Sequence, residues 1–199
     1  MDTTELLSRK HELIDTARRA FAAGLQTNSG GNLSIRLESA SAIVITPSGI
    51  GFADCNIGNL LVISLDGAII EGDLKPSKDL AFHLEIFSIR PDVRAIVHVH
   101  SPWATGWAAA GRPVPCITVH SKSKLNRIPL VPCAPGGKPQ GPAEVRPVIR
   151  KTDVFGAVFE NHGTLGLGKT LQDALNTAEL IEETAHIATV KAIVSATDR

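Results

Sequence analysis

The sequence predicts an α/β fold in a single domain that covers residues 1–199. Two observations lead to this prediction. Segments with apolar residues at helical spacing alternate along the chain with short runs rich in β-branched residues. The chain has 199 residues and is 43% hydrophobic, which is enough for one substantial core, and no repeat, low-complexity segment or linker divides it.

The first third of the chain predicts a helix followed by antiparallel strands. Apolar residues recur at helical spacing from Thr4 to Ala23, and Gly24 follows as a stop. Asp66-Gly67 is a dipeptide that favours tight hairpin turns, and an apolar run lies on each side of it. The expected strands are residues 33–37, residues 42–46 and the runs LLVISL and AII around that dipeptide.

The middle of the chain predicts a second helix and a strand. The helix is expected to open at Pro76-Ser77, because proline is favoured in a first helical turn, and to run to Arg90. Residues 94–100 are rich in β-branched side chains and predict a strand. A short helix is expected to follow, over the segment SPWATGWAAAG.

The last part of the chain contains a proline-rich stretch and a long helix. Residues 112–147 carry eight prolines, which excludes a long helix and predicts short strands and an extended loop. Residues 154–159 predict a buried strand that ends at Glu160. Residues 170–194 then predict a long closing helix.

The composition bounds the partners and the compartment. Twenty basic residues balance twenty acidic ones, so the net charge offers no footprint for nucleic acid or a membrane surface, and a small-molecule ligand is expected instead. The three cysteines, with no C-x-x-C pair, are expected to be reduced and structural. The N-terminal segment is charged and amphipathic, unlike a signal peptide, so a cytoplasmic protein is expected.

The segment GTLGLGKT, residues 163–170, matches the phosphate-binding loop G-x-x-x-x-G-K-[ST]. A nucleotide hydrolase also needs an acidic residue for Mg²⁺ and further strands after the loop helix, but few residues follow Thr170. The alternative is a tight strand-turn-strand over GTLGLG, with Lys169 and Thr170 leading into a helix. We favour this alternative over the nucleotide site.

Three histidines form a candidate metal site. His98 and His100 lie two residues apart on an expected strand, where alternate side chains share a face. Alone, this spacing equally fits an edge strand with two solvated histidines. His162 follows another buried strand, and Gly163 beside it lets the backbone approach an ion, so a third imidazole completes a catalytic site with an open position.

Two other histidines are expected to lie on solvated helix faces and to have no catalytic role. His11 is expected on a polar helix face, and His186 with Glu179, Glu182 and Glu183 is expected to form a solvated stripe on the last helix. A second metal at Glu182 and His186 is allowed by helical geometry but is not favoured.

Five motifs occur in a fixed order: GGNLSIR, ITPSG, KPSKDLAFH, RPDVRAIVHVHSPWAT and ENHG. Together they resemble the class II aldolase/adducin family. The resemblance implies a three-layer α/β/α sandwich around a mostly antiparallel sheet, and a homotetramer with active sites between subunits. It also implies a divalent metal, most commonly Zn²⁺ with Mn²⁺ or another ion as alternatives, bound by His98, His100 and His162.

The resemblance also implies roles for other residues. Asp79 stands at the position of the family's acid/base, although it is also an ordinary first-turn acid. His83, one turn later, is expected to pack in the core rather than to contact Asp79. Lys78 replaces a serine of the sugar-phosphate aldolases and suits a carboxylate or phosphate. The residues expected to bind phosphate or substrate are Ser29, Asn32, Ser48, Gly49, Ser77 and Lys78, several of which are also common turn formers.

The expected activity is that of a metal-dependent carbon–carbon lyase of the aldolase type. It would act on a small, phosphorylated ketose or keto-acid through a metal-stabilised enediolate. The P-S-K motif and IPLVPCAPGG are similar to the 3-oxo-tetronate 4-phosphate decarboxylase branch, and decarboxylation or pentulose-phosphate 4-epimerisation is the alternative. Family aldolases use a tyrosine proton donor, but the chain has no tyrosine, and His120 lies near the equivalent place. A non-enzymatic binding module like the adducin head is the rival from another class.

Overall fold

A single sheet runs through the molecule. The computed structural model describes residues 1–197; the last two residues of the expected domain, Asp198 and Arg199, lie outside this range. Within the described range eight strands pair in the order β4-β3-β2-β1-β5-β8-β7-β6, all antiparallel except β6 with β7. The strands are β1 (Asn32–Arg36), β2 (Ala42–Ile45), β3 (Leu61–Ser64), β4 (Ile69–Glu71), β5 (Ala95–Val99), β6 (Leu130–Val131), β7 (Gly156–Phe159) and β8 (Gly163–Gly168).

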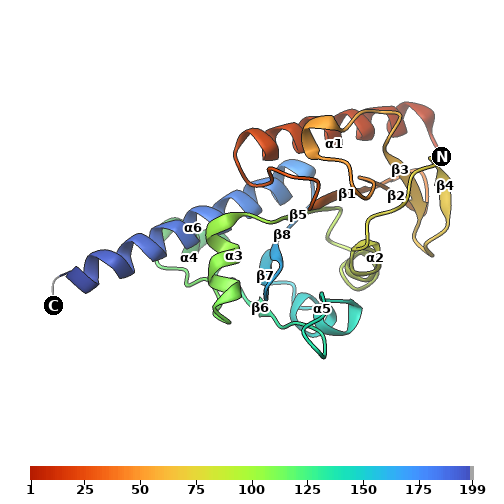
Figure 1. Cartoon of the computed structure of the whole chain (residues 1–199). Helices are drawn as coiled ribbons and strands as arrows, with labels where there is room; N and C mark the ends of the chain where they lie inside the picture. The colour runs from red at the N-terminus through yellow and green to blue at the C-terminus, as the bar shows by residue number, and fades with distance from the viewer. Residues whose placement is uncertain (198–199) are drawn as a thin grey trace.

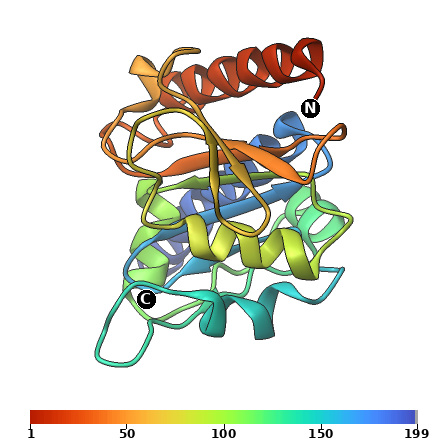
Figure 2. The ribbon, with the colours of Figure 1, turned by 90° about the vertical axis from the view of Figure 1, so that its right-hand side faces the viewer.

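Helices cover both faces of this sheet, as Figures 1 and 2 show. The helices α1, α3, α4 and α6 pack on one face, and α2 and α5 pack on the other. The expected three-layer α/β/α sandwich around a mostly antiparallel sheet is therefore confirmed. The helices are α1 (Thr3–Ala22), α2 (Leu80–Ile89), α3 (Pro102–Ala109), α4 (Val119–Leu125), α5 (Pro142–Ile149) and α6 (Leu171–Thr197), with a short 3₁₀ helix η1 (Phe52–Asp54).

The alternation of side chains along β1 decides which residues meet α2. Leu33 and Ile35 point into the core beneath α1. Asn32 and Ser34 point the other way, and both form hydrogen bonds to His83 of α2. Because successive side chains in a strand face opposite sides, a buried polar row results under α2.

The proline-rich stretch contains two short helices that the sequence analysis missed. Helix α4 begins after Thr118, which forms a capping box with Ser121. Helix α5 has Pro142 in its first turn, where the missing N–H costs nothing, and also tolerates Pro147 in its interior. Eight prolines thus exclude a long helix in this stretch but not helices of two turns.

The segment GTLGLG is one uninterrupted strand, β8. It pairs with β5 on one side and with β7 on the other. Its backbone N–H groups are therefore committed to the sheet, and the exposed Lys169 follows the strand. For GTLGLG itself, both the phosphate loop and the strand-turn-strand are wrong. The expectation that Lys169 and Thr170 lead into a helix is confirmed, since α6 begins at Leu171.

The long helix α6 also differs from its expected description. Glu182 accepts hydrogen bonds from the backbone N–H groups of Trp103 (2.9 Å) and Ala104 (2.8 Å) and so caps α3. The ring of His186 stacks on Trp103 with centroids 4.1 Å apart. The predicted solvated stripe is wrong for Glu182, whose carboxylate caps α3. It is confirmed for His186, which is exposed although its ring stacks on Trp103. Among residues 1–197, no helix combines the length and apolar character that crossing a bilayer requires.

Candidate metal and substrate site

The structure brings the three predicted histidines together at one end of β5 and β8. His98 is the fourth residue of β5, His100 follows that strand, and His162 lies in the turn before β8. The ring centroids lie 5.1 Å apart for His98 and His100, 4.7 Å for His98 and His162, and 5.1 Å for His100 and His162. The spacing argument for His98 and His100 therefore holds, and the sheet order supplies His162.

The positions of the three imidazoles are suitable for binding a metal ion, whatever family the chain resembles. One ligand atom from each lies within 4.8 Å of the others. The buried nitrogens Nε2 of His98, Nε2 of His100 and Nδ1 of His162 have no hydrogen-bond partner within the described residues. Two nitrogens bound to one zinc ion at about 2.0–2.1 Å are at most about 4.2 Å apart, so the rings would close slightly around an ion.

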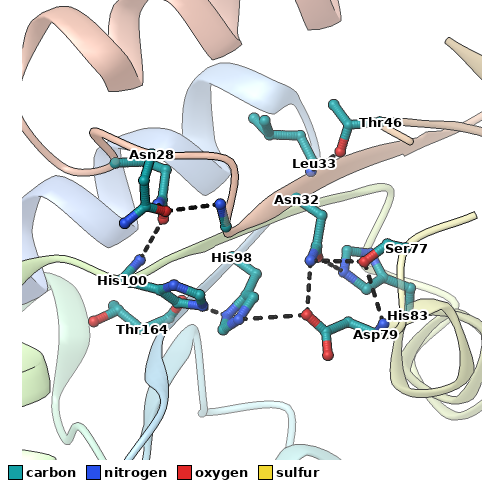
Figure 3. Close-up of polar contacts among 12 residues, drawn as sticks. Asn28, Asn32, Leu33, Thr46, Ser77, Asp79, His83, His98, His100 and Thr164 are labelled. Carbon is teal, nitrogen blue, oxygen red and sulfur yellow. Dashed lines mark hydrogen bonds and ion pairs between the residues drawn. The ribbon is translucent and has the colours of Figure 1, made fainter. Parts of the chain in front are cut away.

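Hydrogen bonding orients His98 for this task. Its Nδ1 atom lies 3.0 Å from the carbonyl oxygen of Thr164. Figure 3 draws this contact as a dashed line. A carbonyl can only accept, so Nδ1 carries the proton and Nε2 keeps its lone pair. The backbone of β8 thus selects the tautomer that a metal ligand needs.

The surroundings keep the cluster neutral. Burial lowers the pKa of His98 well below its ordinary value, and the neighbouring His162 and His100 lower this pKa further. Burial is also the main cause that lowers the pKa values of His100 and His162. The rings of Phe82 and Phe159 lie 5.5 and 5.6 Å from the ring of His98 and exclude water. Neutral imidazoles leave the full charge of a bound cation available to a substrate.

Asp79 lies beside this cluster. One carboxylate oxygen, Oδ2, is 3.7 Å from Nε2 of His98 and accepts a 2.7 Å hydrogen bond from Nδ2 of Asn32. Asp79 occupies the N-cap position of α2, yet its side chain makes no capping hydrogen bond. The carboxylate therefore faces the histidines instead of serving its own helix.

Behind Asp79 a buried polar chain runs from α2 to β1 (Figure 3). Nε2 of His83 lies 2.5 Å from Oδ1 of Asn32, and Nδ1 of His83 lies 2.7 Å from Oγ of Ser34. The expectation that His83 packs in the core rather than contacting Asp79 is confirmed, and its ring is linked to Asp79 only indirectly, through Asn32. The alternation of Asn32 and Ser34 with Leu33 and Ile35 was the available signal, but it equally fits a solvated strand face.

Hydrogen bonds connect the loop before β1 to the backbone of His100. They involve Gln26 and Asn28, which the sequence analysis did not single out. Oε1 of the buried Gln26 accepts the backbone N–H of His100 at 2.8 Å, and its Nε2 donates to Oδ1 of Asn28 at 2.7 Å. The same Asn28 oxygen accepts the N–H of Gly30 at 2.8 Å. A Cβ on Gly30 would lie 2.6 Å from Nδ1 of His100, so a larger residue there would displace the His100 ring.

The candidate phosphate residues lie on three neighbouring loops. Pro47 and Pro76 form an isolated bridge, which places the Ser48–Gly49 turn beside Ser77. Ser29 and Gly49 line a cavity of about 220 Å³ together with Thr27, Asn28 and Asp54.

Not every predicted group is free to bind a substrate. Asn32 is buried, and its amide is already bonded to His83, Asp79 and Ser77. The N–H of Ser48 donates to the carbonyl of Lys75 at 2.9 Å, which leaves its hydroxyl. Lys78 is exposed.

His120 is not brought to this site within the chain. It is exposed on α4 and lines a separate cavity of about 570 Å³ with Lys169 and Glu183. That cavity also contacts Gly168, the last residue of β8, whereas His162 precedes its first residue. A role for His120 in proton transfer would therefore require a neighbouring subunit.

Comparison with known proteins agrees with this geometry. Residues 11–189 match the family described as "Class II Aldolase and Adducin N-terminal domain". The chain belongs to this family. Class II aldolases generally use a divalent metal, which agrees with a cluster of three histidines that could hold an ion.

Several class II aldolase relatives are similar over nearly the whole chain. An L-ribulose-5-phosphate 4-epimerase UlaF of Salmonella paratyphi B is 31% identical over 189 residues, which cover 90% of this chain and 83% of the relative. The crystal structure of YgbL from Escherichia coli, a putative aldolase/epimerase/decarboxylase, has a TM-score of 0.83 at 29% identity and covers 93% of this chain and 90% of that one. An L-fuculose 1-phosphate aldolase has a TM-score of 0.86 at 26% identity, covering 94% and 87%.

Proposed function

We propose that the chain is a metal-dependent carbon–carbon lyase of the aldolase type that acts on a small, phosphorylated ketose or keto-acid. One observation carries this proposal: three buried imidazole nitrogens without partners converge beside the Asp79 carboxylate. An ion with an open position, next to a carboxylate that can move a proton, is the combination that cleavage beside a carbonyl requires.

His98, His100 and His162 would hold the ion, and imidazole ligands favour zinc, with Mn²⁺ as the alternative. When bound, the ion would draw electron density from a substrate oxygen and stabilise the negative charge that develops during bond cleavage. Phe82 and Phe159 limit water at this point. Asp79 would take or return the proton at the reacting carbon or its hydroxyl group.

The phosphate of the substrate would be bound on the loop side of Asp79. Ser29 and Gly49 line the cavity there, and the hydroxyl groups of Ser48 and Ser77 belong to adjoining loops. Small hydroxyls and exposed N–H groups hold an anion without a net positive charge on the protein. Lys78 would bind a second anionic group of the substrate, and Asn32 would act through Asp79.

The complete site would lie between subunits of a homotetramer. The chain has no tyrosine to donate a proton, and His120 is remote from its own metal cluster. In an assembly, His120 of a neighbour would complete the site. The ligand is a small molecule in this proposal, with no role for nucleic acid or a membrane.

Epimerisation at C4 of a pentulose phosphate is the second candidate. It is favoured by the 31% identity to L-ribulose-5-phosphate 4-epimerase over 90% of this chain. Decarboxylation of a 3-oxo-tetronate 4-phosphate is supported by the likeness to YgbL, a putative aldolase/epimerase/decarboxylase. All three reactions create negative charge beside a carbonyl, so the same residues serve each.

A substrate panel tests the proposal. The purified protein, loaded with zinc or manganese, is incubated separately with L-fuculose 1-phosphate, L-ribulose 5-phosphate and a 3-oxo-tetronate 4-phosphate. Release of an aldehyde supports the lyase, a new pentulose phosphate supports the epimerase, and carbon dioxide supports the decarboxylase. Absence of all three products, in a protein that carries its metal, would defeat the proposed lyase activity.

A further inference from the structure

Two fully buried polar residues behind the site have no task in the proposed chemistry. The side chains of Ser34 and His83 are both 0% exposed, and Asn32 in front of them is 2% exposed. Burying polar groups costs free energy even when they are hydrogen-bonded, and apolar residues of similar shape often cost less. Their presence under α2 therefore needs an explanation other than packing.

The hydrogen bonds that link Asp79, Asn32, His83 and Ser34 can have only one set of donors and acceptors. The ionised carboxylate of Asp79 can only accept, so the atom of Asn32 that faces it is the amide nitrogen. The amide oxygen of Asn32 then faces Nε2 of His83, which must carry the imidazole proton. Nδ1 of His83 is consequently an acceptor, and the hydroxyl group of Ser34 donates to it.

This set of donors and acceptors determines how the amide of Asn32 is turned. If the amide rotated by half a turn, its oxygen would face the carboxylate of Asp79 and its nitrogen would face the N–H of His83. Both contacts would be repulsive, and two buried donors would lose their acceptors. With its proton on Nε2, His83 accepts only the amide orientation in which Asn32 can also donate to Asp79.

The positions of the residues in the fold support the same task. Asp79 and His83 are one turn apart at the start of α2, and Asn32 and Ser34 share one face of β1. His83 also stacks on Phe82 at 4.8 Å, and Phe82 in turn contacts His98. The polar chain therefore ties the start of α2 to the strand that pairs with β5, which carries His98.

We propose that Ser34 and His83 are positioning residues that lock the amide of Asn32, so that Asn32 holds the Asp79 carboxylate beside His98. This inference rests on the proposed function, because the lock has a catalytic purpose only if Asp79 acts on a substrate. Neither Ser34 nor His83 touches the substrate. Their effect on the reaction passes through Asn32.

Four variants separate positioning from packing. His83→Leu removes the donor at similar volume, and His83→Gln keeps an amide N–H that can reach the place of Nε2. Ser34→Ala removes the hydroxyl group at small steric cost. Thr46→Val is the matched control: Thr46 follows β2 directly, and the variant removes the buried hydroxyl that accepts the Leu33 N–H of β1. Among the described residues, no hydrogen bond links the Thr46 hydroxyl to Asp79.

The measurements are kcat and KM of the metal-loaded protein, bound metal per chain, and hydrogen exchange of the Asn32 side-chain amide in the metal-free protein. That amide is assigned as the NMR signal pair absent from Asn32→Ser. We expect His83→Leu to lower kcat about 10- to 100-fold, with KM within about twofold and metal content unchanged. Its Asn32 amide should exchange at least about tenfold faster. In His83→Gln, kcat and the slow exchange of the Asn32 amide should be largely restored. Thr46→Val should change neither kcat nor this exchange rate.

Two results would overturn the lock: a kcat for His83→Leu equal to that of Thr46→Val, or equal losses in His83→Leu and His83→Gln. If His83→Leu does not fold, Ser34→Ala takes its place with the same expected directions. If the wild type turns over no substrate, the proposed function fails separately. The amide exchange then still decides, because an unchanged Asn32 signal in His83→Leu or Ser34→Ala refutes the lock itself.

Discussion

Oδ2 of Asp79 lies 3.7 Å from Nε2 of His98, and neither atom belongs to a backbone hydrogen-bond network. A buried imidazole nitrogen without a partner costs free energy, and so does a carboxylate on a side chain that is only 16% exposed. Natural proteins tolerate such costs mainly where a ligand removes them. The pair therefore marks the position at which an ion and a substrate meet.

Replacement of Asp79 by Asn should stop catalysis while the fold and the metal site persist. The two side chains have nearly the same shape, but the amide cannot accept and return a proton. We expect kcat to fall about 10²- to 10⁴-fold. Bound metal per chain and the thermal midpoint serve as controls, and a kcat within threefold of the wild type would exclude Asp79 as the acid/base.

Gly163→Ala should disturb the metal site directly. The added Cβ would lie 2.5 Å from the carbonyl oxygen of Val99 and 2.8 Å from Cδ2 of His100, so the His100 ring has to move. We expect the affinity for zinc to fall at least about tenfold in a chelator competition assay. Gly106→Ala is the matched control, since its Cβ would meet no atom within 4 Å. Equal zinc affinity in both variants would contradict this reading.

The acid sensitivity of the fold should depend on His83. Burial lowers the pKa of His83 to about 3, whereas a histidine in the unfolded chain has a pKa of about 6.5. Between these values the unfolded chain binds more protons than the folded one, so stability is fully present above about pH 6.5 and is lost as the pH falls towards 3.

The variant His83→Gln lacks this proton uptake. In urea titrations of the metal-free protein from pH 7 to pH 4, its free energy of unfolding should decline less steeply than that of the wild type, by up to about 1.4 kcal/mol per pH unit. Parallel curves for the two proteins would show that His83 is not held neutral by burial.

Lys169→Ala should leave the protein unaffected. Lys169 is exposed and follows a strand whose N–H groups are paired on both sides, so it cannot serve a triphosphate as in a phosphate loop. Isothermal titration should detect no binding of Mg-ATP by the wild type or the variant, and the free energy of unfolding should change by less than about 0.5 kcal/mol. Tight ATP binding lost in the variant would reverse this conclusion.

The clustering of the histidines was predictable because it follows from alternation along a strand. His98 and His100 share a face by periodicity alone, and ENHG marked His162 as the third imidazole. The buried chain behind Asp79 was not predictable in this way. The pattern of Asn32 and Ser34 on a strand is the same whether water or a helix covers it, and only the packing of α2 decides.

Local sequence patterns led to wrong predictions where contacts with distant segments of the chain determine the structure. The glycines of GTLGLG suggested a turn, yet β5 and β7 on either side hold this segment extended. At Gly166 a Cβ would overlap the backbone of α6, so glycine there serves close helix packing rather than a turn. Glu182 looked solvated by helical periodicity, because the approach of α3 could not be inferred from its own helix.

The metal content of the purified protein tests the central claim most directly. The protein is stripped with a chelator, titrated with Zn²⁺, and analysed for bound metal beside the double variant His98→Ala with His162→Ala. One ion per chain in the wild type and none in the double variant is the expected result. A wild type that retains no stoichiometric ion, or a double variant that binds it equally well, would contradict the site on which the proposed chemistry depends.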